Sequence, residues 1–85
     1  MKKIIVTITN TTKTFFYDIE VPTDVPVQLL KKDILDTLEG YDSKLFFSDI
    51  FVGLFLNRLN KQLYPNETLA DAGVWTGDYI TLLGV

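Results

Sequence analysis

KQLYPNETLADAGV, residues 61–74, and GDYITLL, residues 77–83, form the stretch that decides the fold. Gln62 to Tyr64 predicts a short strand. It ends before Pro65, because proline has no backbone donor for a neighbouring strand. Thr68 to Val74 predicts a single helical turn, closed by a glycine that adopts the left-handed conformation easily. Tyr79 to Leu83 alternates apolar and polar residues, which is typical of a strand. A short strand, one turn of helix and an end strand therefore follow one another here.

The N-terminal part of the chain predicts a β-hairpin. Lys3 to Thr9 and Thr14 to Val21 both alternate with a period of two, and polar residues lie between them. Asn10 tolerates a left-handed backbone, so we expect the turn to begin there. One face of the hairpin joins the core, and its members are Ile4, Val6, Ile8, Phe15, Tyr17, Ile19 and Val21.

An amphipathic helix is expected over Val27 to Leu38. Its apolar stripe consists of Val27, Leu30, Ile34 and Leu38. Thr23 or Asp24 is placed to accept hydrogen bonds from the first free amides of the helix. Gly40 follows the last apolar position and is expected to end the helix in a left-handed C-cap.

The segment after the helix carries a weaker pattern. Tyr41 to Ser48 is interpreted as a connector with one or two buried anchors, Phe46 and Phe47 being its apolar residues. Ile50 to Asn57 is a continuous apolar run, which predicts a strand buried on both faces or in contact with a partner. Gly53 within this run weakens the strand or marks a bulge.

Composition limits the chemistry that the chain can perform. It has 85 residues, of which 47% are hydrophobic, and this is typical of one folded domain, expected over residues 1–85. The sequence contains no histidine and no cysteine, so it lacks the usual base near neutral pH, the usual zinc ligands and a thiolate nucleophile. We therefore expect neither an enzyme nor a cofactor or metal site.

Charge and hydropathy indicate the kind of partner. The net charge is −3, which argues against nucleic acid. No stretch approaches the ~20 apolar residues that span a membrane, and no signal-peptide pattern follows the start. A chain without cysteine suits the reducing cytosol. We expect a cytoplasmic location and a protein partner, without nucleic acid and without direct membrane insertion.

The order of elements predicts an α+β fold in which a mixed sheet of four to five strands packs on one helix. The core is expected to include Val6, Tyr17, Ile19, Val21, Leu30, Ile34, Leu69, Ile80 and Leu82. Residues 61–74 and 77–83 resemble ubiquitin-like β-grasp chains, which place a lysine-glutamine-leucine, a threonine-leucine-x-aspartate turn and a final strand at this spacing. Tyr17 to Pro22, Val25-Pro26-Val27, Leu35 to Leu38 and Gly77-Asp78 are similar to the YukD/EsaB-like proteins of bacterial type VII secretion systems.

The resemblance implies a function. It points to a non-enzymatic accessory or regulator that acts with membrane-embedded secretion machinery and is not conjugated to targets. The alternative is a protein modifier or sulfur carrier activated at its C-terminus. Such proteins end in a flexible diglycine, whereas this sequence ends Leu82-Leu83-Gly84-Val85, which favours the first function.

The candidate binding residues are apolar side chains expected on the face of the sheet that the helix leaves free. Ile5, Phe16, Tyr79 and Leu83 are expected to form one patch there. The alternative is that they are scattered exposed residues, which are common. A contiguous patch would indicate a binding site, since soluble monomers seldom expose a large one. Trp75 is either a lid over the core or an interface anchor. The patch is expected to bind a membrane-embedded type VII secretion component or a second copy of the chain.

Other polar residues receive structural interpretations. Lys61 stands where ubiquitin has a chain-linking lysine, but one lysine in a turn is usually only solvated. Asp33, Asp36 and Glu39 repeat at helical spacing and are interpreted as a solvated face instead of a metal site.

Overall fold

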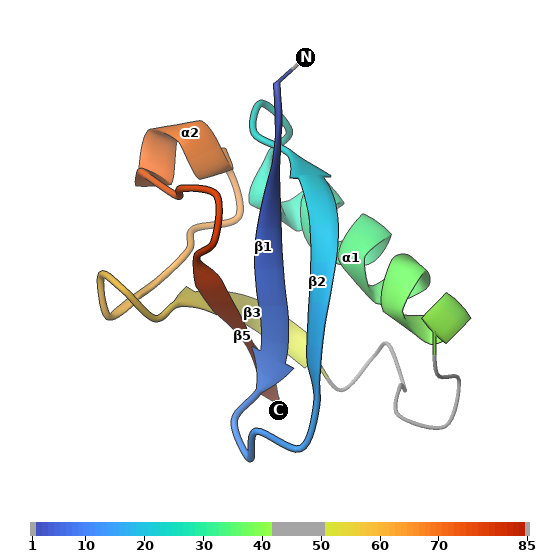
Figure 1. The fold of residues 1–85 in the computed structure, drawn as a ribbon. Helices are drawn as coiled ribbons and strands as arrows, with labels where there is room; N and C mark the ends of the chain where they lie inside the picture. Colours follow the sequence, from blue (N-terminus) through green and yellow to red (C-terminus); the bar gives the residue numbers. More distant parts are fainter. Residues whose placement is uncertain (1, 42–50, 85) are drawn as a thin grey trace.

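The computed structural model describes residues 2–41 and 51–84. In these residues a sheet packs on one long helix. A second, short helix lies on the side of the first strand that is away from the second strand in the view of Figure 1. The elements are β1 (Lys3–Asn10), β2 (Phe16–Pro22), α1 (Val27–Tyr41), β3 (Phe51–Leu56), β4 (Lys61–Gln62), α2 (Leu69–Ala72) and β5 (Tyr79–Gly84).

The sheet has five strands in the order β2-β1-β5-β3-β4. The pair β1 and β5 is parallel, and the other three pairs are antiparallel. The last strand therefore lies in the centre beside the first, which confirms the expected mixed sheet. Figure 1 shows α1 crossing behind the β1–β2 hairpin, so the opposite face of that hairpin is left free.

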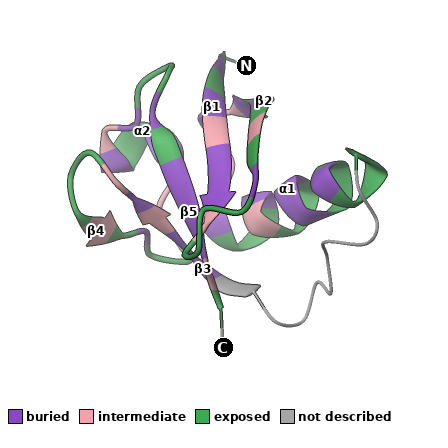
Figure 2. Ribbon diagram, turned by 60° about the horizontal axis from the view of Figure 1, so that its bottom comes forward, coloured by how far each residue is buried: buried purple, intermediate pink, exposed green. Residues whose placement is uncertain are grey.

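The core lies between the sheet and α1. Buried residues alternate with more exposed ones along β2 and the first part of β1, whereas β5 has three consecutive buried residues (Figure 2). All the expected core residues except Tyr17 are buried, and Tyr17 is half-buried against the core. The largest side chains with no exposed surface include Ile8, Leu30, Leu38, Leu54, Leu56, Leu69, Ile80 and Leu82.

The helix is longer than its apolar stripe indicates. α1 continues through Gly40 to Tyr41, so the expected C-cap at Gly40 is wrong. The ring of Tyr41 stacks on Tyr17 of β2 with a centroid distance of 5.5 Å. This contact between distant parts of the chain helps to hold the last turn, and aromatic stacking of this kind is worth about 1 kcal/mol.

The start of α1 is held by another loop and not by its own cap. The amides of Val27 and Gln28 donate to the carbonyl oxygens of Glu67 and Pro65 at 2.8 and 2.9 Å. The hydroxyl of Thr23, an expected cap, donates instead to the carbonyl of Lys2. The cap prediction is wrong because the carbonyl oxygens of a loop distant in sequence accept the free amides. Such amides at the start of a helix lack partners within the helix and need acceptors from elsewhere.

The β1–β2 turn differs in detail from the expectation. The left-handed residue is Lys13, with φ of 54°, and not Asn10. Asn10 is the last residue of β1, and its Oδ1 accepts a hydrogen bond from the Thr14 amide at 2.9 Å. An asparagine side chain that bonds its own loop in this way is a frequent substitute for backbone pairing.

The second half of the sheet contains the expected irregularity. The β3–β5 register shifts between Phe51 and Gly53, which confirms the bulge at Gly53. β4 is Lys61–Gln62, one position earlier than expected and shorter. Leu63 follows the strand directly. Its side chain is buried in the core, and its amide still donates to the Leu54 carbonyl.

The single helical turn predicted after Pro65 is confirmed as α2. Thr68 is its N-cap and forms a capping box with Asp71, and Gly73 ends it with φ of 79°. The Thr68 hydroxyl accepts the Asp71 amide at 3.1 Å. The sequence predicted the turn and its closure at Gly73 but did not name this cap, although its threonine and aspartate stand at the spacing of a capping box.

Replacement of the cap should be measurable. We expect Thr68→Ala to lower the free energy of unfolding by ~1 kcal/mol in urea, because the Asp71 amide loses its acceptor. Thr68→Asp should restore most of the loss, since aspartate also caps well. Equal losses in both variants would show that the methyl group of Thr68 matters and the cap does not.

Candidate functional site

The free face of the sheet carries the candidate site. Ile4, Val6 and Ile8 of β1 are buried toward α1, so Ile5 and Thr7 lie on the opposite face. We call that opposite side the outer face and define it by Ile5, Thr7 and Thr9 of β1, Phe16 of β2, and Tyr79, Thr81 and Leu83 of β5. The hairpin and the end strand together position it.

Two half-exposed aromatic side chains are in contact on the outer face. Phe16 is 52% exposed and Tyr79 is 49% exposed. Their rings meet edge to face with centroids 6.2 Å apart. The register explains this contact, because Phe16 is opposite Thr9 and Tyr79 is opposite Thr7 on the two sides of β1. The structure thus brings together two of the expected binding residues, and Ile5 is exposed on the same face.

A row of threonines interrupts the expected apolar patch. The hydroxyl of Thr7 donates to Asp18 at 2.6 Å, that of Thr9 to the Phe15 carbonyl at 2.7 Å, and that of Thr81 to Asn57 at 2.7 Å. Thr9 and Thr81 are opposite each other and both are buried. The patch is therefore not continuous, because these internally satisfied hydroxyls fill the middle of the face.

Leu83 lies on the far side of the threonine row. It is half-buried and lines an open hollow of about 420 Å³. Phe55 of β3 and Lys13 of the β1–β2 loop line the same hollow. The outer face therefore consists of a raised aromatic pair at one end and a depression at the other.

Trp75 is an exposed ring that covers a cation. It is 66% exposed, and the Arg58 guanidinium lies 4.2 Å from the ring centroid. Such stacking of arginine on tryptophan is attractive. The ring packs on Arg58 and stays largely in solvent, so it does not lie over the core as a lid. A role of Trp75 as an interface anchor stays a prediction.

Arg58 and Asp78 form a paired hydrogen bond that sequence reasoning missed. Arg58 Nε donates to Asp78 Oδ1 at 2.9 Å and an η-nitrogen donates to Oδ2 at 3.1 Å. The same guanidinium donates to the Gly73 carbonyl, and the Trp75 amide donates to Asp78 Oδ2. The hydrogen bonds from Arg58 lower the pKa of the Asp78 carboxyl, and its burial opposes them more weakly. This group of contacts, which we call the Arg58–Asp78 latch, fixes the loop that leads into β5.

The signal for the latch was present in the sequence. Arg58 is the only arginine of the chain, and Asp78 follows a glycine directly before the last strand. Glycine at position 77 has φ of 89°, which aligns the turn. Arginine prefers planar, two-pronged contacts with carboxylates. The separation of 20 positions between the partners hides the pairing from local patterns.

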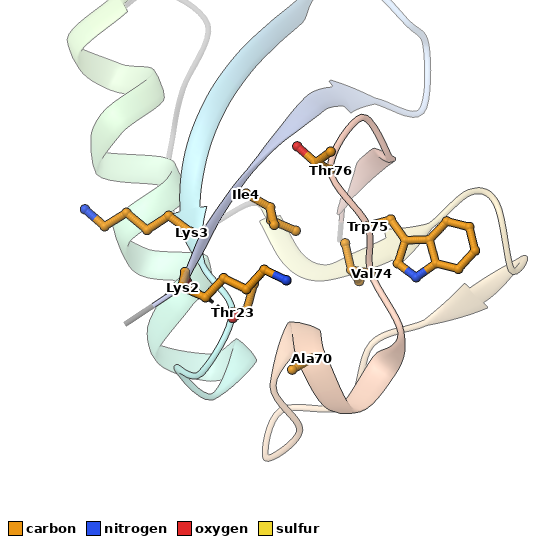
Figure 3. Close-up of a pocket in the computed structure, with 8 residues that line it drawn as sticks. All are labelled: Lys2, Lys3, Ile4, Thr23, Ala70, Val74, Trp75 and Thr76. Carbon is orange, nitrogen blue, oxygen red and sulfur yellow. Dashed lines mark hydrogen bonds between the residues drawn. The ribbon is translucent and has the colours of Figure 1, made fainter.

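A second open hollow lies beside the first residues of β1. Its volume is about 530 Å³, and Figure 3 shows its lining residues, among them Ile4, Ala70 and Val74. Trp75 is one of the lining residues. Its ring points away from Ile4 in this view and packs on the Arg58 guanidinium. Trp75 therefore stands at the edge of the hollow, which the sequence did not predict.

The acidic residues of α1 do not gather into a metal site. Asp33, Asp36 and Glu39 are exposed. Within residues 2–41 and 51–84, no cluster of three potential metal ligands occurs. Lys61 lies 3.6 Å from Glu67, an ordinary surface pair. The expected anchors Phe46 and Phe47 lie outside the described residues.

The described helices include none that is both long and apolar enough to span a bilayer.

A mixed five-stranded sheet with a parallel central pair, packed on one helix, defines a ubiquitin-like β-grasp domain. A family model described as "WXG100 protein secretion system (Wss), protein YukD" matches residues 3–82. The chain belongs to this YukD family, which confirms the resemblance read from the sequence. No curated protein matches the chain.

Solved structures confirm the fold. The ubiquitin-like domain of the Mycobacterium tuberculosis type VII secretion protein EccD1 is 22% identical, with a TM-score of 0.75 over 99% of this chain and 100% of that one. The EccD5 ubiquitin-like domain from Mycobacterium xenopi is 17% identical, with a TM-score of 0.78 over 100% and 97%. A chain of an ESX-5 inner membrane complex is 13% identical, with a TM-score of 0.78, and this chain covers 21% of it.

Proposed function

We propose that the chain is a non-enzymatic interaction module of a type VII secretion system, which acts on the cytoplasmic side and is not conjugated to targets. Membership of the YukD family supports this. A domain of the same fold occurs in a chain of the ESX-5 inner membrane complex. By analogy, we propose that the partner is a membrane-embedded component of the machinery.

The outer face is the proposed docking surface. The observation that carries this proposal is the Phe16–Tyr79 pair, two half-exposed rings in contact on the face opposite α1. Aromatic anchors of this kind provide much of the affinity of protein interfaces. Ile5 extends the apolar surface, the hollow beside Leu83 can receive a partner side chain, and Trp75 is a further anchor at the edge.

Two charge substitutions test this surface. We expect Phe16→Asp and Tyr79→Asp to weaken capture of the detergent-solubilised secretion complex roughly tenfold or more, because each places a charge in the centre of an apolar contact. Both side chains are half-exposed, so the free energy of unfolding should change by less than about 1 kcal/mol. Binding would be measured by pull-down and folding by thermal melting.

Tyr64→Asp is the matched control. Tyr64 is another exposed tyrosine, in the loop whose Pro65 carbonyl holds the start of α1, away from the outer face. It should bind as the unsubstituted protein does. Folded Phe16→Asp and Tyr79→Asp proteins with full binding would show that the outer face is not the docking surface.

A further inference from the structure

The edge of the sheet at β2 is open. In the part of the chain that the structure describes, β1 alone pairs with β2, and β2 is seven residues long. The opposite edge, β4, has two residues. Short edge strands offer few free backbone groups, whereas a long one is a template for another strand. β2 is therefore the edge at which an added strand can pair.

The register shows which backbone groups point outward. The Thr7 amide donates to the carbonyl of Asp78 and the Ile5 carbonyl accepts the Gly77 amide, so these odd-numbered residues of β1 direct their backbone groups toward β5 and its preceding turn. The alternating residues of β1 must then bond β2, and they are opposite Tyr17, Ile19 and Val21. The backbone groups of Phe16, Asp18 and Glu20 consequently face the open edge.

Charge identifies the strand that fits. Asp18 and Glu20 are exposed on the outer side of β2. Asp18 accepts the Thr7 hydroxyl, and Glu20 lies 3.9 Å from Lys3 in an exposed pair that an incoming cation can exchange with. On the helix side, a shallow hollow of about 40 Å³ lies between β2 and α1. Its lining is mainly apolar, with Ile19, Val21 and Leu30, but it also includes Glu20, Asp33 and Thr37. A strand added here would direct alternate side chains toward the carboxylates of Asp18 and Glu20 and into this hollow. Basic residues that alternate with small aliphatic ones match both sides.

A second copy of the chain does not match. Two β2 strands that pair antiparallel through all three outward residues place Asp18 opposite Asp18. Like charges directly opposite each other destabilise strand pairs, and the chain has a net charge of −3. The acidic edge therefore disfavours pairing with itself while it attracts a basic strand.

We propose that β2 accepts a strand of a partner protein in which lysine or arginine alternates with small aliphatic residues. Backbone hydrogen bonds to Asp18 and Glu20 would supply affinity, and the carboxylates would supply specificity, as in other cases of strand addition. This inference does not depend on docking at the outer face.

The test uses a short capped peptide in which lysine alternates with valine, and the same peptide with glutamate in place of lysine. We expect the lysine peptide to slow hydrogen exchange of the Asp18 and Glu20 amides in NMR spectra, while the Ile19 amide, already bonded to β1, stays as it is. The glutamate peptide should leave all three unchanged. Exchange that slows equally with both peptides, or at neither outward amide with the lysine peptide, would overturn the proposal.

Matched variants separate the edge from general electrostatics. Asp18→Asn/Glu20→Gln should bind the lysine peptide roughly three- to tenfold more weakly, the effect of losing two exposed charge pairs. Asp24→Asn/Glu39→Gln removes two exposed carboxylates elsewhere and should bind unchanged. An equal loss in both double variants would contradict strand recognition by β2.

A backbone variant and an outer-face variant complete the test. Glu20→Pro removes one outward amide, a substitution that sheet edges tolerate, and should abolish binding without unfolding the protein. If its melting shows unfolding, the charge variants decide. Tyr79→Asp should bind the peptide normally, so failure of this inference and failure of outer-face docking are distinguishable.

Discussion

Leu30→Ala should lower the free energy of unfolding by about 2–5 kcal/mol, which is the largest effect expected from a single core substitution here. Leu30 has no exposed surface and belongs to the cluster between α1 and the sheet. Truncation removes apolar contact and leaves a cavity that a small domain cannot fill. Domains have only about 5–15 kcal/mol of stability, so the variant should be close to unfolding. Urea denaturation measures the change.

Leu29→Ala is the control for this prediction. Leu29 is the neighbouring residue and is 58% exposed, so its truncation should cost less than about 0.5 kcal/mol. Similar losses in the two variants would mean that the buried side of α1 is assigned incorrectly.

Asp78→Asn should destabilise the domain by about 1–3 kcal/mol at neutral pH, the cost of weakening the hydrogen bonds of a buried charged group. Asp78 is buried, and its carboxylate holds both Arg58 and the Trp75 amide. The substitution keeps the shape of the side chain but removes the charge that the guanidinium pairs with. Asp24→Asn, at an exposed carboxylate, should change stability little.

The pH dependence gives this prediction a second measurement. The pKa of Asp78 is lower in the folded protein, chiefly through its hydrogen bonds with Arg58. The latch therefore stabilises the fold fully above the unfolded pKa, about 3.9, and the gain is lost as the pH falls through the lower folded value. Wild type should lose more stability than Asp78→Asn between pH 5 and pH 2. Parallel curves would show that the carboxylate is not coupled to folding.

The elements with strong local patterns were predictable from the sequence. The alternation of Lys3 to Thr9, the stripe of Leu30 and Ile34, and the helical turn closed by Gly73 each depend on neighbours within a few residues. Their periods decide which side faces the core, and burial confirms those assignments. The resemblance then supplied the order of strands, which local periodicity does not contain.

The features that sequence reasoning missed all depend on contacts between distant residues. The end of α1 is extended by Tyr41 on Tyr17, and its start is held by the carbonyl of Pro65. Arg58 and Asp78 are 20 positions apart in the sequence, so their contact depends on how the strands are arranged. Tertiary contacts of this kind override local capping preferences.

The candidate site was predictable in part. Alternation placed Ile5, Phe16 and Tyr79 correctly on the exposed side of the sheet. It did not reveal that Thr9 and Thr81 would be buried between the aromatic pair and Leu83, because that requires the register of three strands. The outer face is therefore a partly polar surface with an aromatic pair at one end and a hollow at the other. Specificity for a partner can come from this shape as well as from the apolar area.

The measurement that most directly tests docking at the outer face is site-specific photo-crosslinking in cells that carry the secretion system. A benzophenone amino acid would replace Tyr79, and in a parallel strain Tyr64, and crosslinked proteins would be identified by mass spectrometry. Docking through the outer face predicts a crosslink from position 79 to a membrane-embedded secretion component and none from position 64. A crosslink to that component from position 64 but not from position 79, in cells that still secrete, would contradict it.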